Sequence, residues 1–364
     1  MTMNWAKIRQ VAAREWREFA TINSSDRPWQ MPFAAAIAAG LPLLVAAAFG
    51  RMAEGMIVSL SGFVFLYLPA TPLHHRMGAL MAFCFGMICC FTLGAFAHVM
   101  PIARAPLTTL VAIFATMICR YYRVGPPGSL FFIMACAIGA YTPGAWSDIP
   151  FRTGLLAIGC IHTLLIAYIY SIFILARRPA DAIPPAPVAG FNRVWFDSIV
   201  IGLFIGLSLS LAEALSLEKP YWVPISCLAI IQGVSLRAVW NRQVHRIAGT
   251  AIGLLLTWGM LPFVENGWIV ATMVMGLIFL IETAIVRHYG FAVIFITPVA
   301  ILLAEAPTLG HGDTDALVAA RFIDTLLGVS VGFVGALCLH NPVFRTRAGR
   351  WLRPLIPERM IEGD

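Results

Sequence analysis

Long apolar stretches recur along the whole of this 364-residue chain, and few charged residues interrupt them. Charged residues make up 12% of the sequence, whereas an average soluble domain carries about 25%. A single soluble core cannot bury so much apolar surface, but helices of about 20 residues can place it against lipid. The pattern predicts an all-helical integral membrane protein. It excludes a soluble enzyme, a disordered chain and a nucleic-acid-binding protein.

The apolar stretches divide into twelve predicted membrane helices, and five of them are shorter than the roughly 20 residues that usually span a bilayer. Their approximate ranges are 31–49, 55–71, 77–97, 105–120, 128–143, 153–176, 196–216, 221–236, 244–263, 267–286, 290–305 and 318–340.

The distribution of positive charge predicts how these helices are oriented. With the N-terminus in the cytoplasm, 20 of the 25 Lys and Arg residues fall on the cytoplasmic side. Such an excess is typical of multi-pass membrane proteins. Both termini are therefore predicted to lie in the cytoplasm. The basic residues 1–30 are interpreted as an amphipathic cytoplasmic arm rather than a cleavable signal peptide.

A Pro-rich cytoplasmic linker, residues 177–195, separates two predicted six-helix units, residues 31–176 and 196–340. A basic cytoplasmic tail, residues 341–364, follows the second unit. The two units share features at matching places, such as Arg152 and Arg321 at the start of the last helix of each. An even number of helices predicts repeats with the same topology, related by an axis along the membrane normal.

The second unit carries two motifs of a known family. Lys219-Pro-Tyr-Trp-Val-Pro224, followed by His245-Arg-Ile-Ala-Gly-Thr-Ala-Ile-Gly253, resembles the fusaric acid resistance family of aromatic acid exporters, and Arg321-Phe-Ile-Asp-Thr-Leu-Leu-Gly328 is similar to its last-helix motif. The clear match covers residues 218–340. The resemblance implies a bacterial inner-membrane protein with two six-helix units that exports aromatic carboxylic acids. Plant malate channels are distant relatives of similar topology.

The chain departs from the larger members of that family in one respect. Those members carry a sizeable cytosolic domain after each membrane unit, whereas this sequence has a short linker and a 24-residue tail. Pairing with a periplasmic adaptor protein is therefore not assumed. A homodimer is left open.

Ionisable groups within membrane helices are costly, so they are candidates for function. The residues predicted to bind the anionic substrate are Arg152, Arg321, Tyr221, Trp222, Arg237, Arg242 and Arg246. The residues predicted to couple transport to protons are Asp324, Glu282 and His162.

Each candidate also has a structural interpretation. Arg321 and Asp324 are one helical turn apart and can pair with each other. Arg152 can reach the outer headgroups, Glu282 can pair with Arg287, and His162 can be a hydrogen-bonded core residue. Tyr221 and Trp222 also suit an ordinary interfacial belt.

The basic turns around residues 74–76 and 237–246 are expected to meet at one cytoplasmic vestibule, where they would attract anions. Anchoring to anionic lipid is the alternative for this inner cluster. Glycines spaced by four, at positions 249, 253, 328 and 332, are expected to let helices pack closely.

The sequence contains no Walker A loop and no metal-binding constellation, so it predicts neither an ATPase nor a cofactor. The eight cysteines lie in apolar stretches and are interpreted as reduced, packed thiols. The sequence thus predicts a proton-coupled secondary exporter of small organic anions, aromatic carboxylic acids among them. A passive organic-anion channel on the same fold and a non-transporting envelope-assembly protein remain alternatives, and an integral membrane enzyme comes last.

Overall fold

The computed structural model describes residues 21–185, 190–305 and 314–353. Every regular element in these ranges is a helix and none is a strand, so the predicted all-helical class is confirmed. Residues 1–20 of the predicted N-terminal arm and residues 354–364 of the predicted tail lie outside the described part of the chain.

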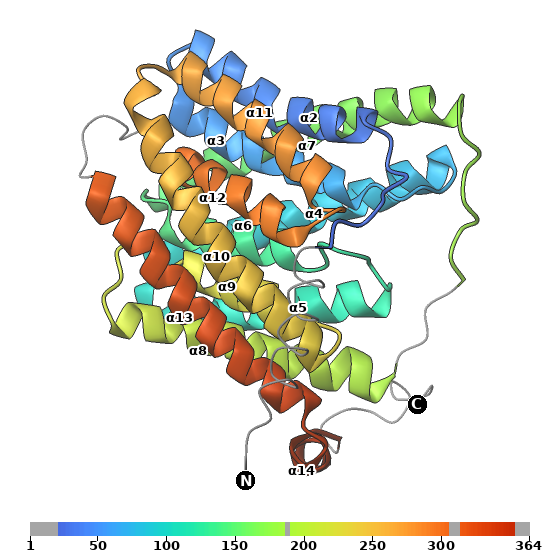
Figure 1. The fold of residues 1–364 in the computed structure, drawn as a ribbon, viewed down its shortest axis with the longest axis vertical. Coiled ribbons are helices and arrows are strands. Elements are labelled where there is room, and N and C mark those ends of the chain that lie inside the picture. The colour runs from blue at the N-terminus through green and yellow to red at the C-terminus, as the bar shows by residue number, and fades with distance from the viewer. Residues whose placement is uncertain (1–20, 186–189, 306–313, 354–364) are drawn as a thin grey trace, which may run out of the picture.

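The helices follow the predicted order along the chain (Figure 1). The first half contains α2 (Gln30–Ala48), α3 (Met52–Leu60) continued by the 3-10 helix η1 (Ser61–Tyr67), α4 (Leu73–Val99), α5 (Arg104–Tyr121), α6 (Leu130–Tyr141) and α7 (Ile149–Leu175). The second half contains α8 (Asp197–Ala214), α9 (Trp222–Ile231), α10 (Leu236–Met260), α11 (Gly267–Ala284), α12 (Tyr289–Glu305), α13 (Thr314–His340) and α14 (Pro342–Leu352).

In the described residues, eight helical segments are long and apolar enough to cross a membrane. Four further apolar segments, 52–67, 130–141, 222–231 and 289–303, are shorter. The chain is therefore a multi-pass membrane protein. Among the shorter segments, nine of the ten residues of α9 are buried, so α9 packs against protein rather than lipid.

Helix α10 differs from its prediction. It begins at Leu236, about eight residues before the predicted start, because Ser235 caps it by accepting a hydrogen bond from the backbone N–H of Ala238 at 3.2 Å. Arg246 therefore lies ten residues into α10, about 15 Å along the helix axis. The sequence placed this arginine at the inner end instead.

The helix pairings of one half have counterparts in the other. Helix α4 packs on α6 and α7, as α10 packs on α12 and α13. The most extensive packing between the halves involves two helix pairs: α2 of the first packs on α11 of the second, and α8 of the second packs on α5 of the first. Figure 1 shows α2 and α11 together at the top of the molecule. Thus α2 of the first half packs against the second half, and α8 of the second half packs against the first.

Glycines allow the closest of these pairings. A Cβ atom at Gly253 would lie 2.6 Å from the carbonyl oxygen of Ile294 on α12, and one at Gly332 would lie 2.5 Å from that of Cys227 on α9. Gly249 and Gly328 meet backbone oxygens in the same way. The expectation that these four glycines serve helix packing is confirmed.

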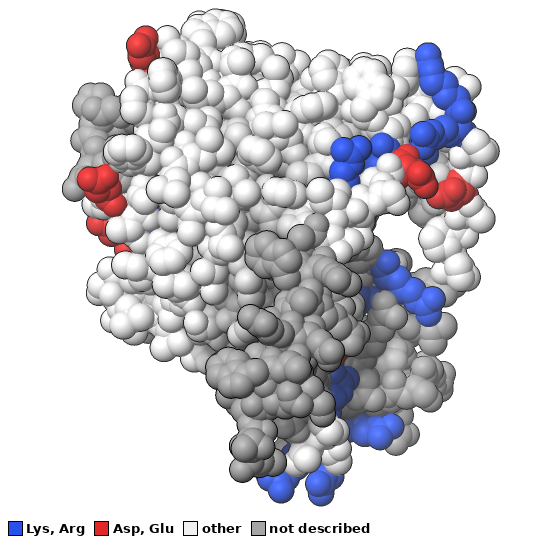
Figure 2. Space-filling view, in the orientation of Figure 1, with Lys and Arg blue, Asp and Glu red and all other residues white. Residues whose placement is uncertain are grey.

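Charged side chains gather at opposite edges of the face in Figure 2. Lys and Arg lie at the right-hand and lower edges, whereas Asp and Glu lie at the left-hand edge, apart from a group beside the basic residues at the upper right. In Figure 1 the linker between α7 and α8 runs along the right-hand edge. We call the linker's side inner and the opposite side outer.

Candidate functional site

A cavity of about 1560 Å³ lies between the two halves. The first half contributes residues of α3, η1, α6 and α7, and the second half contributes residues of α9 to α13. Its lining includes residues near the outer ends of helices, such as Glu54 and Arg152, and residues near the inner ends, such as Arg120 and Arg242. The cavity therefore extends through much of the depth of the helix bundle.

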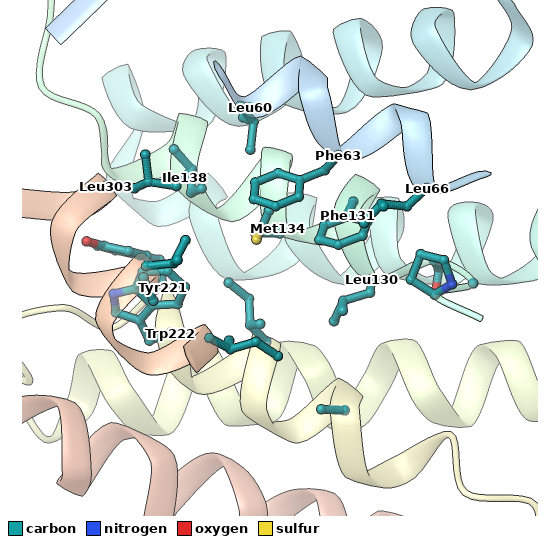
Figure 3. A pocket seen from close by; sticks show the side chains of 18 of the residues that line it. Leu60, Phe63, Leu66, Leu130, Phe131, Met134, Ile138, Tyr221, Trp222 and Leu303 are labelled. Atoms are coloured by element: carbon teal, nitrogen blue, oxygen red, sulfur yellow. The ribbon is translucent and has the colours of Figure 1, made fainter. Parts of the chain in front are cut away.

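The middle of the cavity is apolar and aromatic. Phe63 of η1 and Phe131 of α6 stack with their ring centroids 4.7 Å apart and their planes 11° apart. Figure 3 shows these two rings in the cavity on the side of the first half, with Tyr221 and Trp222 on the opposite side. Flat ring surfaces on both sides suit a planar organic molecule.

Arg321 of α13 is a buried cation in the wall of this cavity, with 4% of its surface exposed. Its guanidinium carbon lies 4.0 Å from the ring centroid of Trp222 at the start of α9. In the described part of the chain its Nε and Nη1 atoms have no hydrogen-bond partner. A buried guanidinium strongly favours hydrogen-bonded partners. The arrangement therefore places a buried cation, incompletely hydrogen-bonded in the described structure, beside the cavity.

Arg246 of α10 is a second buried cation in the same wall. Its Nη2 atom lies 3.5 Å from the hydroxyl oxygen of Ser226, and its Nε atom has no hydrogen-bond partner in the described structure. Ser226 follows Trp222 by four residues on α9, a separation of about 6 Å along the helix. Arg246 and Arg321 thus contact the same side of α9 at successive depths.

Asp324 of α13 is buried, with 1% of its surface exposed. Neither of its carboxyl oxygens has a hydrogen-bond partner among the described residues. The predicted pairing of Arg321 with Asp324 is therefore wrong, although the two residues are one turn apart on α13. Stacking on Trp222 accounts for the difference, because it holds the guanidinium against α9.

Arg152 of α7 is held by its own half of the protein. Its Nη1 atom donates to the carbonyl oxygen of Thr142 at 3.1 Å, its Nη2 atom donates to the carbonyl oxygen of Pro143, and Asp148 lies 3.8 Å away. Arg152 is in the cavity lining, as expected of a substrate-binding candidate, but the loop before α7 supplies partners for its guanidinium.

Glu282 of α11 pairs with Arg27 at 3.0 Å, not with Arg287 as predicted. Arg27 also donates to the carbonyl oxygen of Glu282 at 3.1 Å. Both residues line the inner part of the cavity.

His162 of α7 is absent from the cavity lining, and neither ring nitrogen has a hydrogen-bond partner in the described ranges. It is therefore not the hydrogen-bonded core histidine that the structural interpretation supposed.

The two basic turns do not meet in one vestibule. Arg242 and Arg246 line the cavity, whereas His74, His75, Arg76 and Arg237 are absent from its lining. Arg76 is buried in the first turn of α4, where its Nε atom donates to the carbonyl oxygen of Thr71 at 2.6 Å. The early start of α10 explains why only one turn reaches the cavity.

Other residues near the inner end of the cavity were not singled out from the sequence. The inner mouth is lined by Arg27, Arg120, Arg123, Arg242 and Glu282. Two of these cations have carboxylate partners, Arg27 with Glu282 and Arg120 with Asp197, so the four cations still leave this mouth with a positive charge that attracts anions. Arg120 and Arg123 lie in the predicted cytoplasmic segment after the fourth helix, so their charge was visible, but their place at the mouth depends on the packing of α5 and α6.

At the outer end, Tyr141 of α6 donates a hydrogen bond to Glu213 of α8 at 2.5 Å. Tyr141 lines the large cavity and also a shallow outer pocket that includes Arg104 and Glu213. The guanidinium of Arg104 lies 5.0 Å from the Tyr141 ring. Tyr141 thus forms part of the wall between the cavity and the outer surface.

Within the described ranges, no group of three or more His, Cys, Asp or Glu side chains could hold a metal ion. The cysteines in these ranges are free thiols, five of them buried.

The family comparison concerns the second half of the chain. Residues 201–335 match the model of a family described as fusaric acid resistance protein-like. The chain is 28% identical over 165 residues to the "Uncharacterized membrane protein YvaC" of Bacillus subtilis (strain 168). This match covers 45% of this chain and 26% of the relative. It is 30% identical over 146 residues to the "Uncharacterized protein ORF2" of Neisseria gonorrhoeae. This match covers 39% of this chain and 33% of the relative.

The matched region thus spans about a quarter to a third of the length of these curated relatives. No solved structure matches the chain.

Proposed function

We propose that the chain, whose residues 201–335 match the fusaric acid resistance protein-like family, is a secondary transporter that moves small organic anions out of the cytoplasm. Aromatic carboxylic acids are the favoured substrates. The observation that carries this proposal is the buried guanidinium of Arg321, a residue of the cavity lining, which stacks on Trp222 and whose Nε and Nη1 atoms have no hydrogen-bond partner in the described structure.

The charges along the cavity support an anion path. An anion would enter at the basic inner mouth, pass Arg242 and Arg246, and reach Arg321 closer to the outer end. A guanidinium can bind a carboxylate through two parallel N–H donors. The stacked rings of Phe63 and Phe131 offer a flat apolar surface to the rest of the molecule.

Asp324 is the proposed proton carrier. Its carboxyl group is buried on α13, one turn from Arg321, and is free of hydrogen bonds in the described structure. A carboxyl group without fixed partners can exchange a proton when the cavity changes its exposure to either side. Glu282 is a weaker candidate because it is paired with Arg27. His162 and Asp324 are both absent from the cavity lining, but Asp324 lies one helical turn from the lining residue Arg321, whereas His162 is on α7.

The proposal extends to the architecture and the location. The eight long and four shorter apolar segments would make twelve membrane helices in two parallel repeats, supported by the matching helix pairings of the halves. The charge distribution favours cytoplasmic termini and, in a bacterium, the inner membrane. In this proposal the chain is not an enzyme and needs no cofactor.

The test is transport by the purified protein in liposomes with a pH-sensitive dye inside and an acidic medium outside. Liposomes are loaded with aromatic or aliphatic carboxylates, and with an aromatic sulfonate that cannot cross the bilayer as a neutral acid. We expect efflux of the aromatic anions together with acidification inside. Asp324→Asn should abolish the acidification, and Arg321→Gln should strongly slow the efflux.

Two other results would change the conclusion. Anion efflux without proton movement, unchanged in Asp324→Asn, would identify a passive anion channel, which the depth of the cavity also allows. Absence of both efflux and binding for every anion would refute the proposed transport function and leave a role in envelope assembly.

A further inference from the structure

The last helix, α14, turns away from the membrane helix before it. One residue, Asn341, joins α13 to α14, and its side-chain oxygen accepts hydrogen bonds from the N–H groups of Val343 at 2.9 Å and Phe344 at 3.1 Å. Figure 1 shows α14 end-on at the bottom of the molecule, whereas α13 runs across the picture. A helix that starts one residue after a membrane span lies at the level of the lipid headgroups.

The two faces of α14 differ. Phe344, Ala348 and Leu352 pack against the core cluster that contains Phe196 and Leu339. Val343, Arg347, Arg350 and Trp351, which extend from the edge of this packed face around the helix, are exposed, and Trp351 is 82% exposed. The helix carries three arginines and no acidic residue. Arginine with tryptophan on one exposed face is typical of helices that lie in the membrane interface.

We propose that the exposed face of α14 binds the anionic headgroups of phospholipids in the leaflet where α13 ends. Arg347 and Arg350 would donate hydrogen bonds to lipid phosphates, and Trp351 would lie at the boundary between headgroups and acyl chains. Figure 2 shows basic side chains at the lower edge, where Figure 1 places α14. A cationic face without acidic residues complements the negative surface of an anionic leaflet.

The third arginine of α14 connects the helix to the cavity. Arg345 donates to the Asp197 carboxylate at 2.8 Å and to the carbonyl oxygen of Leu339 at 3.0 Å. Asp197, at the start of α8, also accepts from Arg120 at 2.9 Å, and Arg120 lines the inner mouth. Lipid bound to α14 therefore also steadies one wall of the inner mouth. This inference does not depend on the transported substrate.

The test is hydrogen exchange of residues 342–352 in two kinds of nanodisc. One contains phosphatidylcholine alone, and in the other roughly a third of the lipid is phosphatidylglycerol. We expect the backbone amides of α14 to exchange about fivefold more slowly in the anionic discs at low salt, and the difference to shrink at high salt. The double variant Arg347→Gln, Arg350→Gln should lose the difference. Arg51→Gln, which removes an exposed arginine paired with Glu54 before α3, is the matched control and should keep it.

Equal exchange of α14 in the two kinds of disc would refute the proposal. Protection by inorganic phosphate in phosphatidylcholine discs, to the same extent as by anionic lipid, would assign the site to free phosphate and would also refute it. Exchange of α4 in the same samples shows whether the double variant is folded. If α4 exchanges as in the wild type, loss of protection in α14 reports on lipid binding.

Discussion

Arg152 on α7 and Arg321 on α13 lie at corresponding places in the two halves, and their surroundings differ. Arg152 donates to the carbonyl oxygens of Thr142 and Pro143 and has Asp148 nearby. Arg321 is buried against Trp222, with two nitrogen atoms that have no hydrogen-bond partner in the described structure.

The comparison shows that the neighbouring segments, more than the arginine, determine which guanidinium is fully hydrogen-bonded within the protein. In the first half the loop between α6 and α7 reaches the guanidinium and satisfies it. In the second half an aromatic ring supports the guanidinium from one side and leaves donors unused. An unsatisfied buried donor costs about 1–3 kcal/mol, and an anionic substrate bound there would remove that cost.

The largest effect that we expect is from Arg321→Gln. Loss of a charge-assisted hydrogen bond of about 1.5–3 kcal/mol should lower the rate of anion efflux about 10- to 100-fold. Arg321→Lys keeps the charge but loses the planar fork and its stacking on Trp222, so it should recover only part of the rate. Efflux from liposomes under one imposed gradient measures both. Wild-type efflux in the Gln variant, at equal protein content, would show that Arg321 is structural.

Asp324→Asn should separate anion movement from proton movement. The amide cannot carry a proton across the membrane, so acidification inside the liposomes should fall to the level of protein-free liposomes, while anion efflux changes by less than about tenfold. The measurement is dye fluorescence together with radiolabelled anion in the same liposomes. Proton movement that persists in the variant would remove Asp324 from the coupling step.

Glu282→Gln tests a buried charge that already has a partner within the protein. Glu282 is paired with Arg27, just as Arg152 is hydrogen-bonded by its own loop. The variant leaves Arg27 with the backbone carbonyl of residue 282 but without the carboxylate. We expect a loss of about 1–2 kcal/mol in the free energy of unfolding. Thermal unfolding in detergent measures it, and the double variant Arg27→Gln, Glu282→Gln should be less unstable than the two single effects predict together. Strict additivity would show that the ion pair contributes nothing.

The helices could be predicted from the sequence because apolar runs and their flanking charges are local features. The ranges for α2, α7 and α13 needed nothing else. The partners of buried charges could not be predicted, because they come from distant segments. The partner of Glu282 is Arg27, which is 255 residues away, and not Arg287, which is close in the sequence.

The binding residues divide in the same way. Residue type suggested Arg321 and Trp222 separately, but their stacking depends on the packing of α9 against α13. The position of Arg246 depended on one cap: Ser235 starts α10 early and carries this arginine inward to Ser226. A serine before an arginine-rich segment was the available signal for that start.

The smallest effect on transport should come from Arg152→Gln, and this variant decides whether the comparison holds. Glutamine keeps one hydrogen-bond donor for the loop carbonyls but loses the weak contact with Asp148. Because half-exposed ion pairs contribute only about 0–1 kcal/mol, we expect anion efflux to change less than about threefold and the unfolding temperature by a few degrees at most. Both variants should be assayed in the same liposomes. If Arg152→Gln impairs efflux as strongly as Arg321→Gln, the arginines act as an equivalent pair, and the loop around Arg152 must open during transport to release its guanidinium to the anion.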